Sequence, residues 1–277
     1  MILSDDDTGE ASLPLALQLG GRRLVKADIY DAAEWYDVDY AGYLGELRFY
    51  RRVCEGLDRS DTIVELGAGT GRLTRPLLHD GYGLWAVEPS SSMRARLLLH
   101  ASHALGRGLW VEDALGHTFV GPPSPPALVI FPFNGILHVR GRAALDATLG
   151  HIKARLRPGG RFALDQTVPY WESMRRGCVP WGRVDERVHP TTGESFLTCD
   201  RSTYDRAARL MTIDIRYALL RGDEVIQTKL EQFMWTSTEM LAALERADFV
   251  VEHAYGDVDL SPFHEGAPRL LVVARAR

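Results

Sequence analysis

The feature that most constrains the fold is an apolar, β-branched run that leads directly into three closely spaced glycines. Residues 62–72 read TIVELGAGTGR, with glycines at 67, 69 and 71. Glycine lacks a Cβ atom, so such a turn can be tight and a ligand can approach its backbone closely. A strand that ends in a glycine turn and opens a helix is typical of ligand-binding α/β sheets. The segment therefore predicts a strand over 62–66 and a helix from about Gly71 to Gly81.

The following residues repeat this alternation of short apolar runs and longer amphipathic segments. Further strands are expected at 83–87, 109–111, 127–131 and 161–165, with helices at 91–105 and 142–156. Strands that alternate with helices give a parallel sheet covered by helices on both faces. The sequence therefore predicts a doubly wound α/β fold.

The pattern changes after Asp165, where apolar and polar residues alternate over 195–203, 210–220 and 224–235. Such alternation predicts three antiparallel strands. A helix to Ala247 and strands at 249–255 and 269–274 then return to the main sheet, and the aromatic-rich residues 28–53 predict an amphipathic cap. The expected organisation is an N-terminal helical cap (1–55), a core (56–168), an antiparallel β insertion that serves as a lid or dimer element (169–235) and a return to the core (236–277).

Charge and cysteine content exclude several classes of protein. The formal net charge is −5, so a nucleic-acid partner is not expected. Cys54, Cys178 and Cys199 contain no CxxC pair and fit neither a disulfide framework nor a zinc site. The acidic N-terminus does not resemble a secretory signal, and no apolar run is long enough to span a membrane. A cytoplasmic protein without a membrane partner is expected.

Two carboxylates after the next expected strands add to the evidence of the glycine turn for a ligand site. Glu88 ends the next expected strand, about 20 residues after Gly67, where an acid can accept both hydroxyls of a ribose. Asp113 follows the strand after that and can accept from an adenine amine. Nicotinamide enzymes also use an acid at the position of Glu88, but their turn has the spacing GxGxxG, whereas this turn reads GxGxG.

These motifs resemble the class I S-adenosylmethionine-dependent methyltransferases, whose fold is a Rossmann-like sheet of seven strands. The resemblance covers roughly residues 60–165 and implies S-adenosylmethionine as cofactor and S-adenosylhomocysteine as product. It implies that Glu65 and the turn hold the methionine portion, that Glu88 takes the ribose, and that Met93, Asp113 and Ala114 frame the adenine. The implied cofactor residues are Glu65, Gly67, Ala68, Gly69, Gly71, Arg72, Glu88, Pro89, Met93, Asp113, Ala114 and Phe133.

The segment after the fourth expected strand, FPFNGILH (131–138), lies where these enzymes place groups that face the reacting methyl. It resembles a subgroup with an FN...H signature and differs from the (Asn/Asp)-Pro-Pro-(Tyr/Phe) tetrapeptide of DNA and protein-glutamine methyltransferases. His138 is the candidate general base, with packing in the next helix as its alternative. The paired acids of metal-dependent catechol methyltransferases are absent here, so no metal is implied.

Residues expected to contact the acceptor come from three segments. Tyr36 and Tyr40 share one face of the predicted cap helix, with an aromatic core stripe as the alternative. The other candidates are Asn134, Gln166 and Tyr170. The predicted reaction is methyl transfer to nitrogen or oxygen of a small metabolite or natural product, and a homodimer is plausible through an exposed strand of the insertion. Alternatives are a protein or RNA acceptor, a nicotinamide oxidoreductase and a non-catalytic binding subunit.

Overall fold

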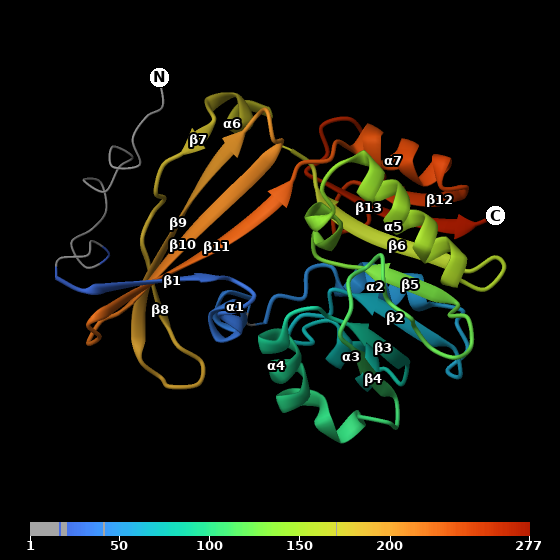
Figure 1. Ribbon diagram of the computed structural model, residues 1–277, viewed down its shortest axis with the longest axis horizontal. Coiled ribbons are helices and arrows are strands. Elements are labelled where there is room, and N and C mark those ends of the chain that lie inside the picture. Colours follow the sequence, from blue (N-terminus) through green and yellow to red (C-terminus); the bar gives the residue numbers. More distant parts are fainter. Residues whose placement is uncertain (1–16, 18–20, 41, 170) are drawn as a thin grey trace. The chain divides into compact units, whose positions relative to one another are not determined.

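The computed structural model describes residues 17, 21–40, 42–169 and 171–277, which form two compact units (Figure 1). The core unit comprises residues 42–169 and 235–277, and the second unit comprises 1–41 and 170–234. The expected division placed residues 1–55 together in one cap. The contacts of the chain instead assign the residues up to 41 to the second unit and residues 42–55 to the core unit.

The core unit is built on a mixed seven-stranded sheet in the order β12-β13-β6-β5-β2-β3-β4. Its strands are β2 (Thr62–Leu66), β3 (Gly83–Val87), β4 (Leu109–Glu112), β5 (Leu128–Phe131), β6 (Arg161–Thr167), β12 (Phe249–Tyr255) and β13 (Arg269–Ala276). Strands β2 to β6 pair in parallel, and β13 runs antiparallel to both of its neighbours. All four residues of the central strand β5 are buried, as expected for a parallel strand covered on both faces. The predicted Rossmann-like sheet is therefore confirmed.

Helices cover both faces of this sheet (Figure 1). They are α2 (Leu47–Cys54), α3 (Thr74–His79), α4 (Ser91–Ala101), α5 (Arg142–Arg155) and α7 (Ser237–Arg246), with 3-10 turns η2 (Ser102–Ala104) and η3 (Gly135–His138). Ser90 caps α4 by accepting from the backbone N–H of Met93, and Thr236 with Glu239 forms a reciprocal capping box at α7. The predicted helix at 71–81 begins only at Thr74, because Gly69 and Gly71 adopt left-handed backbone conformations.

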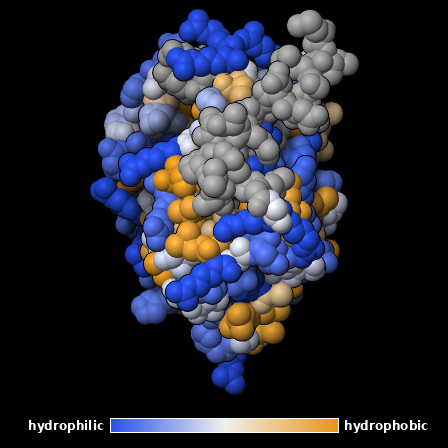
Figure 2. All heavy atoms as spheres, turned by 90° about the vertical axis from the view of Figure 1, so that its left-hand side faces the viewer, coloured by the Kyte–Doolittle hydropathy of each residue, from blue (hydrophilic) through white to orange (hydrophobic). Residues whose placement is uncertain are grey.

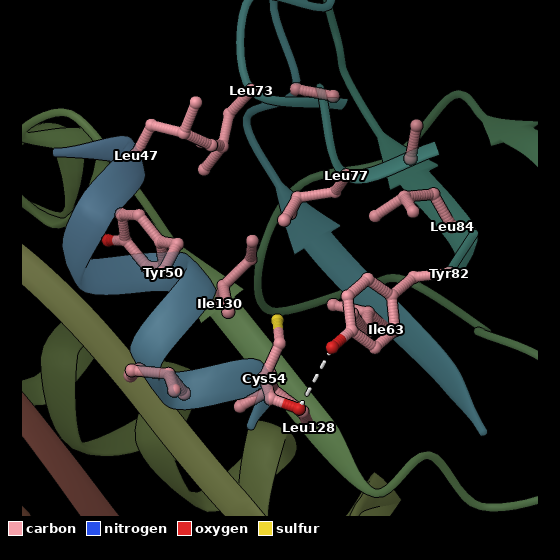
Figure 3. Packing of buried hydrophobic residues seen from close by; sticks show 14 of the residues in the cluster. Leu47, Tyr50, Cys54, Ile63, Leu73, Leu77, Tyr82, Leu84, Leu128 and Ile130 are labelled. Atoms are coloured by element: carbon pink, nitrogen blue, oxygen red, sulfur yellow. Dashed lines mark hydrogen bonds between the residues drawn. The ribbon is translucent and has the colours of Figure 1, made fainter. Parts of the chain in front are cut away.

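The main core lies between α2 and the sheet (Figure 3). Leu47, Tyr50 and Cys54 of α2 pack in one cluster with Ile63 of β2 and Ile130 of β5. The Tyr82 hydroxyl donates to the Cys54 carbonyl at 3.1 Å, so this buried polar group is satisfied. Helix α2 is thereby fixed beside the strand that carries the glycine turn.

The second unit contains a six-stranded sheet in the order β1-β11-β10-β9-β7, with β8 also paired to β9. Its elements are β1 (Arg23–Asp28), α1 (Ala33–Tyr40), α6 (Trp171–Arg176), β7 (Cys178–Val179), β8 (Asp185–Val188), β9 (Ser195–Asp205), β10 (Leu210–Leu219) and β11 (Glu224–Phe233). Strands β9, β10 and β11 pair antiparallel at the positions expected from alternation. Trp35 of α1 packs against Phe196 and Tyr217 of this sheet.

The N-terminal segment, predicted as a helical cap, contains a strand as well as helices. Residues Arg23–Asp28 form strand β1, which pairs in parallel with β11. Sequence patterns detect such a strand poorly, because it is short and its partner lies far away along the chain. On the face shown in Figure 2, hydrophobic residues form groups separated by hydrophilic ones. Among the described residues, no helix is both long and apolar enough to cross a membrane.

Candidate functional site

The glycine turn joins β2 to α3 at the carboxyl edge of the parallel strands. Gly67, Gly69 and Gly71 have φ angles of 66°, 59° and 86°, a region that favours glycine. A Cβ atom at Gly69 would meet nothing within 4 Å, whereas one at Gly71 would lie 2.4 Å from Leu97 Cδ1. Gly69 therefore leaves open space beside the turn, and Gly71 allows close packing of α4.

We expect these two glycines to respond differently to the same substitution. Gly71→Ala should lower the free energy of unfolding by about 2 kcal/mol more than Gly69→Ala, because only the former overpacks the core. Gly69→Ala should weaken ligand binding at least about tenfold, since its methyl group occupies the open space beside the turn. Urea unfolding and calorimetric titration of both variants check this, and equal stabilities would contradict it.

Most backbone N–H groups of the turn are already bonded within the protein. The N–H groups of Gly67 and Ala68 donate to the Val87 carbonyl at 2.8 and 3.2 Å. The Gly69 N–H donates to Glu88 Oε2 at 2.8 Å, and the Gly71 N–H donates to the Ala68 carbonyl at 3.0 Å. A turn that binds pyrophosphate instead directs such N–H groups at the ligand. The observed geometry therefore does not favour a dinucleotide.

Glu88 lies directly after β3 and is buried. Its two carboxylate oxygens accept from the Gly69 N–H and the Ser90 N–H, each at 2.8 Å. Burial raises the pKa of Glu88 above its usual value, and the two backbone hydrogen bonds act in the opposite direction. A carboxylate has about four lone-pair sites, so two acceptor positions remain for a diol.

Glu65 lies in β2 beneath the turn and is fully buried. It accepts from the Thr74 hydroxyl at 2.6 Å. Burial raises the pKa of Glu65 to about 7, an effect opposed by Thr74 and Arg72 and reinforced by Glu88 and Glu46. A cationic ligand at this position would favour the ionised form.

The raised pKa predicts a dependence of stability on pH. The folded protein holds a proton on Glu65 between about pH 4.5 and pH 7 that the unfolded chain releases, so this group lowers stability as pH rises through that window. Glu65→Gln keeps an acceptor for Thr74 and removes the titration. Between pH 5 and pH 8, we expect the variant to gain about 2 kcal/mol over the wild type in urea unfolding. Glu55→Gln, at an exposed carboxylate, is the control, and parallel pH profiles for wild type and Glu65→Gln would contradict the assignment.

The residues proposed around an adenine lie near the same edge, with different exposures. Met93 is fully buried in α4, and Ala114 is half-buried. Asp113 and Pro89 are exposed, and Asp113 pairs with Arg94 at 2.7 Å. An adenine amine would therefore compete with Arg94 for this carboxylate.

The loop after β5 has an unusual backbone. Phe133 and Asn134 both have positive φ angles, of 53° and 62°. The Asn134 side-chain oxygen accepts from the Thr167 N–H at 2.6 Å, so it ties the loop to β6. For residues other than glycine this backbone conformation costs free energy, and such residues are frequent at functional sites.

His138 ends η3, a short turn that begins immediately after Asn134. By accessible surface the residue is exposed, although neighbouring protein atoms surround its imidazole. Partial removal from water lowers the pKa of His138 below its usual value, and the charge of Arg140 contributes in the same direction. The imidazole is therefore neutral at pH 7, as a general base requires.

Arg72 follows the turn and connects it to two other segments. Its guanidinium carbon lies 4.1 Å from the centre of the Phe133 ring and 5.6 Å from that of Tyr43. It donates to the Tyr43 carbonyl at 3.1 Å and forms an ion pair with the buried Glu46. The predicted cofactor residues Arg72 and Phe133 thus contact each other, and Arg72 also contacts Tyr43 and Glu46, which were not among the predicted site residues.

The expected acceptor residues fall into different parts of the structure. Gln166 of β6 is buried in the core unit and donates to the Trp235 carbonyl at 3.0 Å. Tyr36 and Tyr40 lie in the second unit, with ring centres 4.7 Å apart on one face of α1. Tyr170 lies outside the described residues. Their roles with an acceptor stay predictions.

Among the described residues, no group of three or more His, Cys, Asp and Glu side chains is arranged to hold a metal ion. The buried carboxylate Asp165, in contrast, is a centre of contacts, whereas the residue of this segment predicted to bind the acceptor is its neighbour Gln166. Its signal in the sequence is a charged residue within the apolar run of β6. A carboxylate at such a position requires partners.

Comparison with known proteins gives a family and a fold. A family model described as a methyltransferase domain matches residues 39–254. An uncharacterized methyltransferase of Geobacillus kaustophilus is 31% identical over 145 residues, which are 49% of this chain and 63% of that protein. The chain thus matches less than two thirds of the length of this curated relative.

Two solved structures share the fold at 19% identity. The CcbJ methyltransferase from Streptomyces caelestis superposes with a TM-score of 0.69 over 85% of this chain and 91% of its own. The second is CalS10, an amino pentose methyltransferase from Micromonospora echinaspora involved in calicheamicin biosynthesis, solved with S-adenosylmethionine bound. It superposes with a TM-score of 0.63 over 91% of this chain and 98% of its own. With the family model matching most of its length, the chain belongs to the methyltransferase domain family.

Proposed function

We propose that this protein transfers a methyl group from S-adenosylmethionine to a nitrogen or oxygen atom of a small-molecule acceptor. Its family and fold are those of S-adenosylmethionine-dependent methyltransferases, and S-adenosylmethionine is the cofactor. The transfer to nitrogen or oxygen and the small-molecule class of the acceptor are the parts of this proposal that go beyond family and fold. The observation that carries it is the glycine turn: the N–H groups of Gly67, Ala68, Gly69 and Gly71 are bonded within the protein, and the carboxylates Glu65 and Glu88 lie beside it.

The residues present fit this cofactor. The open space at Gly69 admits a ligand beside the turn, Glu88 has acceptor capacity for ribose hydroxyls, and Glu65 supplies negative charge for a cation. When bound, the cofactor supplies an electrophilic methyl group on a good leaving group. The protein therefore contributes mainly orientation and exclusion of water. His138, neutral at pH 7, is our candidate to accept the proton of the acceptor.

A small acceptor is supported by two observations. The net charge of −5 opposes binding to nucleic acid, and CalS10, which shares the fold, is described as acting on an amino pentose. The same proposal includes Tyr36, Tyr40, Asn134 and Gln166 as acceptor-binding residues, a homodimer and a cytoplasmic location. Light scattering of the purified protein tests the dimer.

The experiment that tests the function has two stages. Calorimetric titration with S-adenosylmethionine, and separately with NADH, first identifies the cofactor. Incubation with radiolabelled S-adenosylmethionine and panels of amino sugars, phenols, protein and RNA then identifies the acceptor class. Methylation of a small amine or hydroxyl supports the proposal, and methylation of protein or RNA alone overturns the acceptor class. Cofactor binding without transfer to any panel would favour a binding subunit.

A further inference from the structure

The buried carboxylate of Asp165 joins three separate segments of the core unit. Its side chain is fully buried in β6. The Tyr50 hydroxyl of α2 donates to Oδ1 at 2.7 Å, and Arg269 of β13 forms an ion pair with Oδ2. The Phe133 N–H, from the loop after β5, also donates to Oδ1 at 2.7 Å. One carboxylate therefore connects a helix, the antiparallel strand and the loop.

Both the side chain and the backbone of Asp165 hold this loop. The Asn134 N–H donates to the Asp165 carbonyl at 3.2 Å, next to the bond from Phe133 to the carboxylate. Phe133 and Asn134 are the two residues of this loop that have positive φ angles. For a bulky residue such as Phe133 this conformation is strained, by about 1–3 kcal/mol, and persists only where surrounding contacts fix it. A hydrogen bond to a charged, buried acceptor is strong enough to do so.

The loop matters because it packs against the glycine turn. The Phe131 ring, at the end of β5 directly before the loop, lies 3.5 Å from the position of a Cβ atom at Gly67. The Phe133 ring lies against the Arg72 guanidinium. The loop also leads directly into η3, which ends at His138. A change in the backbone at Phe133 would therefore move the groups proposed to face the reacting methyl.

From these contacts we infer that Asp165 is a positioning residue for methyl transfer, which fixes the loop of Phe133 and Asn134 through its Oδ1 atom. This inference rests on the proposed function for its catalytic consequence. The fixing of the loop by Asp165 does not depend on which cofactor or acceptor the protein binds.

The experiment isolates the single bond from the Phe133 N–H. Tyr50→Phe and Arg269→Met first remove the other partners of the carboxylate, since a buried charge left unpaired is strongly destabilising. In this background, Asp165→Asn keeps the Oδ1 acceptor, whereas Asp165→Leu has a similar volume and no acceptor. The two triple variants differ only in the residue at position 165. Comparing them therefore tests whether the asparagine, which keeps the acceptor, preserves the loop that the leucine would release.

Hydrogen exchange of the Phe133 amide is the first readout. We expect it to be at least about tenfold faster in the Leu variant than in the Asn variant, with exchange in β2 equal in both. With the acceptor found by the panel, kcat should also fall at least about tenfold in the Leu variant relative to the Asn variant. Equal exchange and equal kcat in the two variants would overturn the inference.

The wild-type protein provides a second test, which does not depend on the folding of variants. The Phe133 amide should be protected about as well as the amides of β6. Exchange at the rate of an exposed peptide would show that the bond to Asp165 does not hold the loop. Failure to bind S-adenosylmethionine would instead count against the proposed function and leave the exchange result standing.

Discussion

Glu88→Ala should weaken S-adenosylmethionine binding at least about 100-fold, as measured by calorimetric titration. The proposed bonds from two ribose hydroxyls to this carboxylate are charge-assisted, and each contributes about 1.5–3 kcal/mol. The same carboxylate also fixes the turn, because it accepts from the Gly69 N–H. The substitution therefore removes ligand contacts and loosens the backbone beside them.

Two control variants make this result specific. Glu55→Ala removes an exposed carboxylate that pairs only with Arg52 among the contacts described, and should leave the dissociation constant unchanged. Asp113→Ala removes an exposed carboxylate already paired with Arg94, so a loss of at most about tenfold is expected. A dissociation constant for Glu88→Ala within threefold of the wild type would show that Glu88 does not hold the cofactor.

His138→Gln should lower kcat about 100-fold with the acceptor identified by the panel, while cofactor binding changes little. General base catalysis contributes about 10²- to 10⁴-fold, and glutamine retains a polar group without accepting a proton near pH 7. Because the pKa of His138 is lowered, the imidazole stays unprotonated as pH falls from 8 to 6. The wild-type kcat should therefore be constant over that range and decline only at lower pH.

The matched control is His264→Gln, at an exposed imidazole whose described contact is the carbonyl of the adjacent Glu265. It should leave kcat unchanged. An unchanged kcat for His138→Gln as well would mean that orientation alone drives transfer and that His138 serves packing. A decline in wild-type kcat centred on pH 6.5 would contradict the lowered pKa.

The sequence determined the elements of the core unit because their signals are local. The strands at 62–66 and 83–87 have the predicted bounds, since buried apolar runs ended by glycine, proline or an acid are distinctive. The glycine spacing and Glu88 similarly indicated the cofactor class, because ligand chemistry requires those residue types at the ends of neighbouring strands.

Tertiary structure decided what depends on partners distant in sequence. Strand β1 forms because β11 offers an edge, and no local pattern records that pairing. Asp165 becomes the centre of a network only because β6 brings it to Tyr50, Phe133 and Arg269 from three other segments. The sequence by itself predicted which residues bind an adenosine cofactor, whereas the structure alone showed which buried groups contact the loop beside them. The physical reason is that the conformation of a glycine turn depends on adjacent residues in the sequence. The partners of a buried charge, in contrast, come from distant segments that only the folded chain brings together.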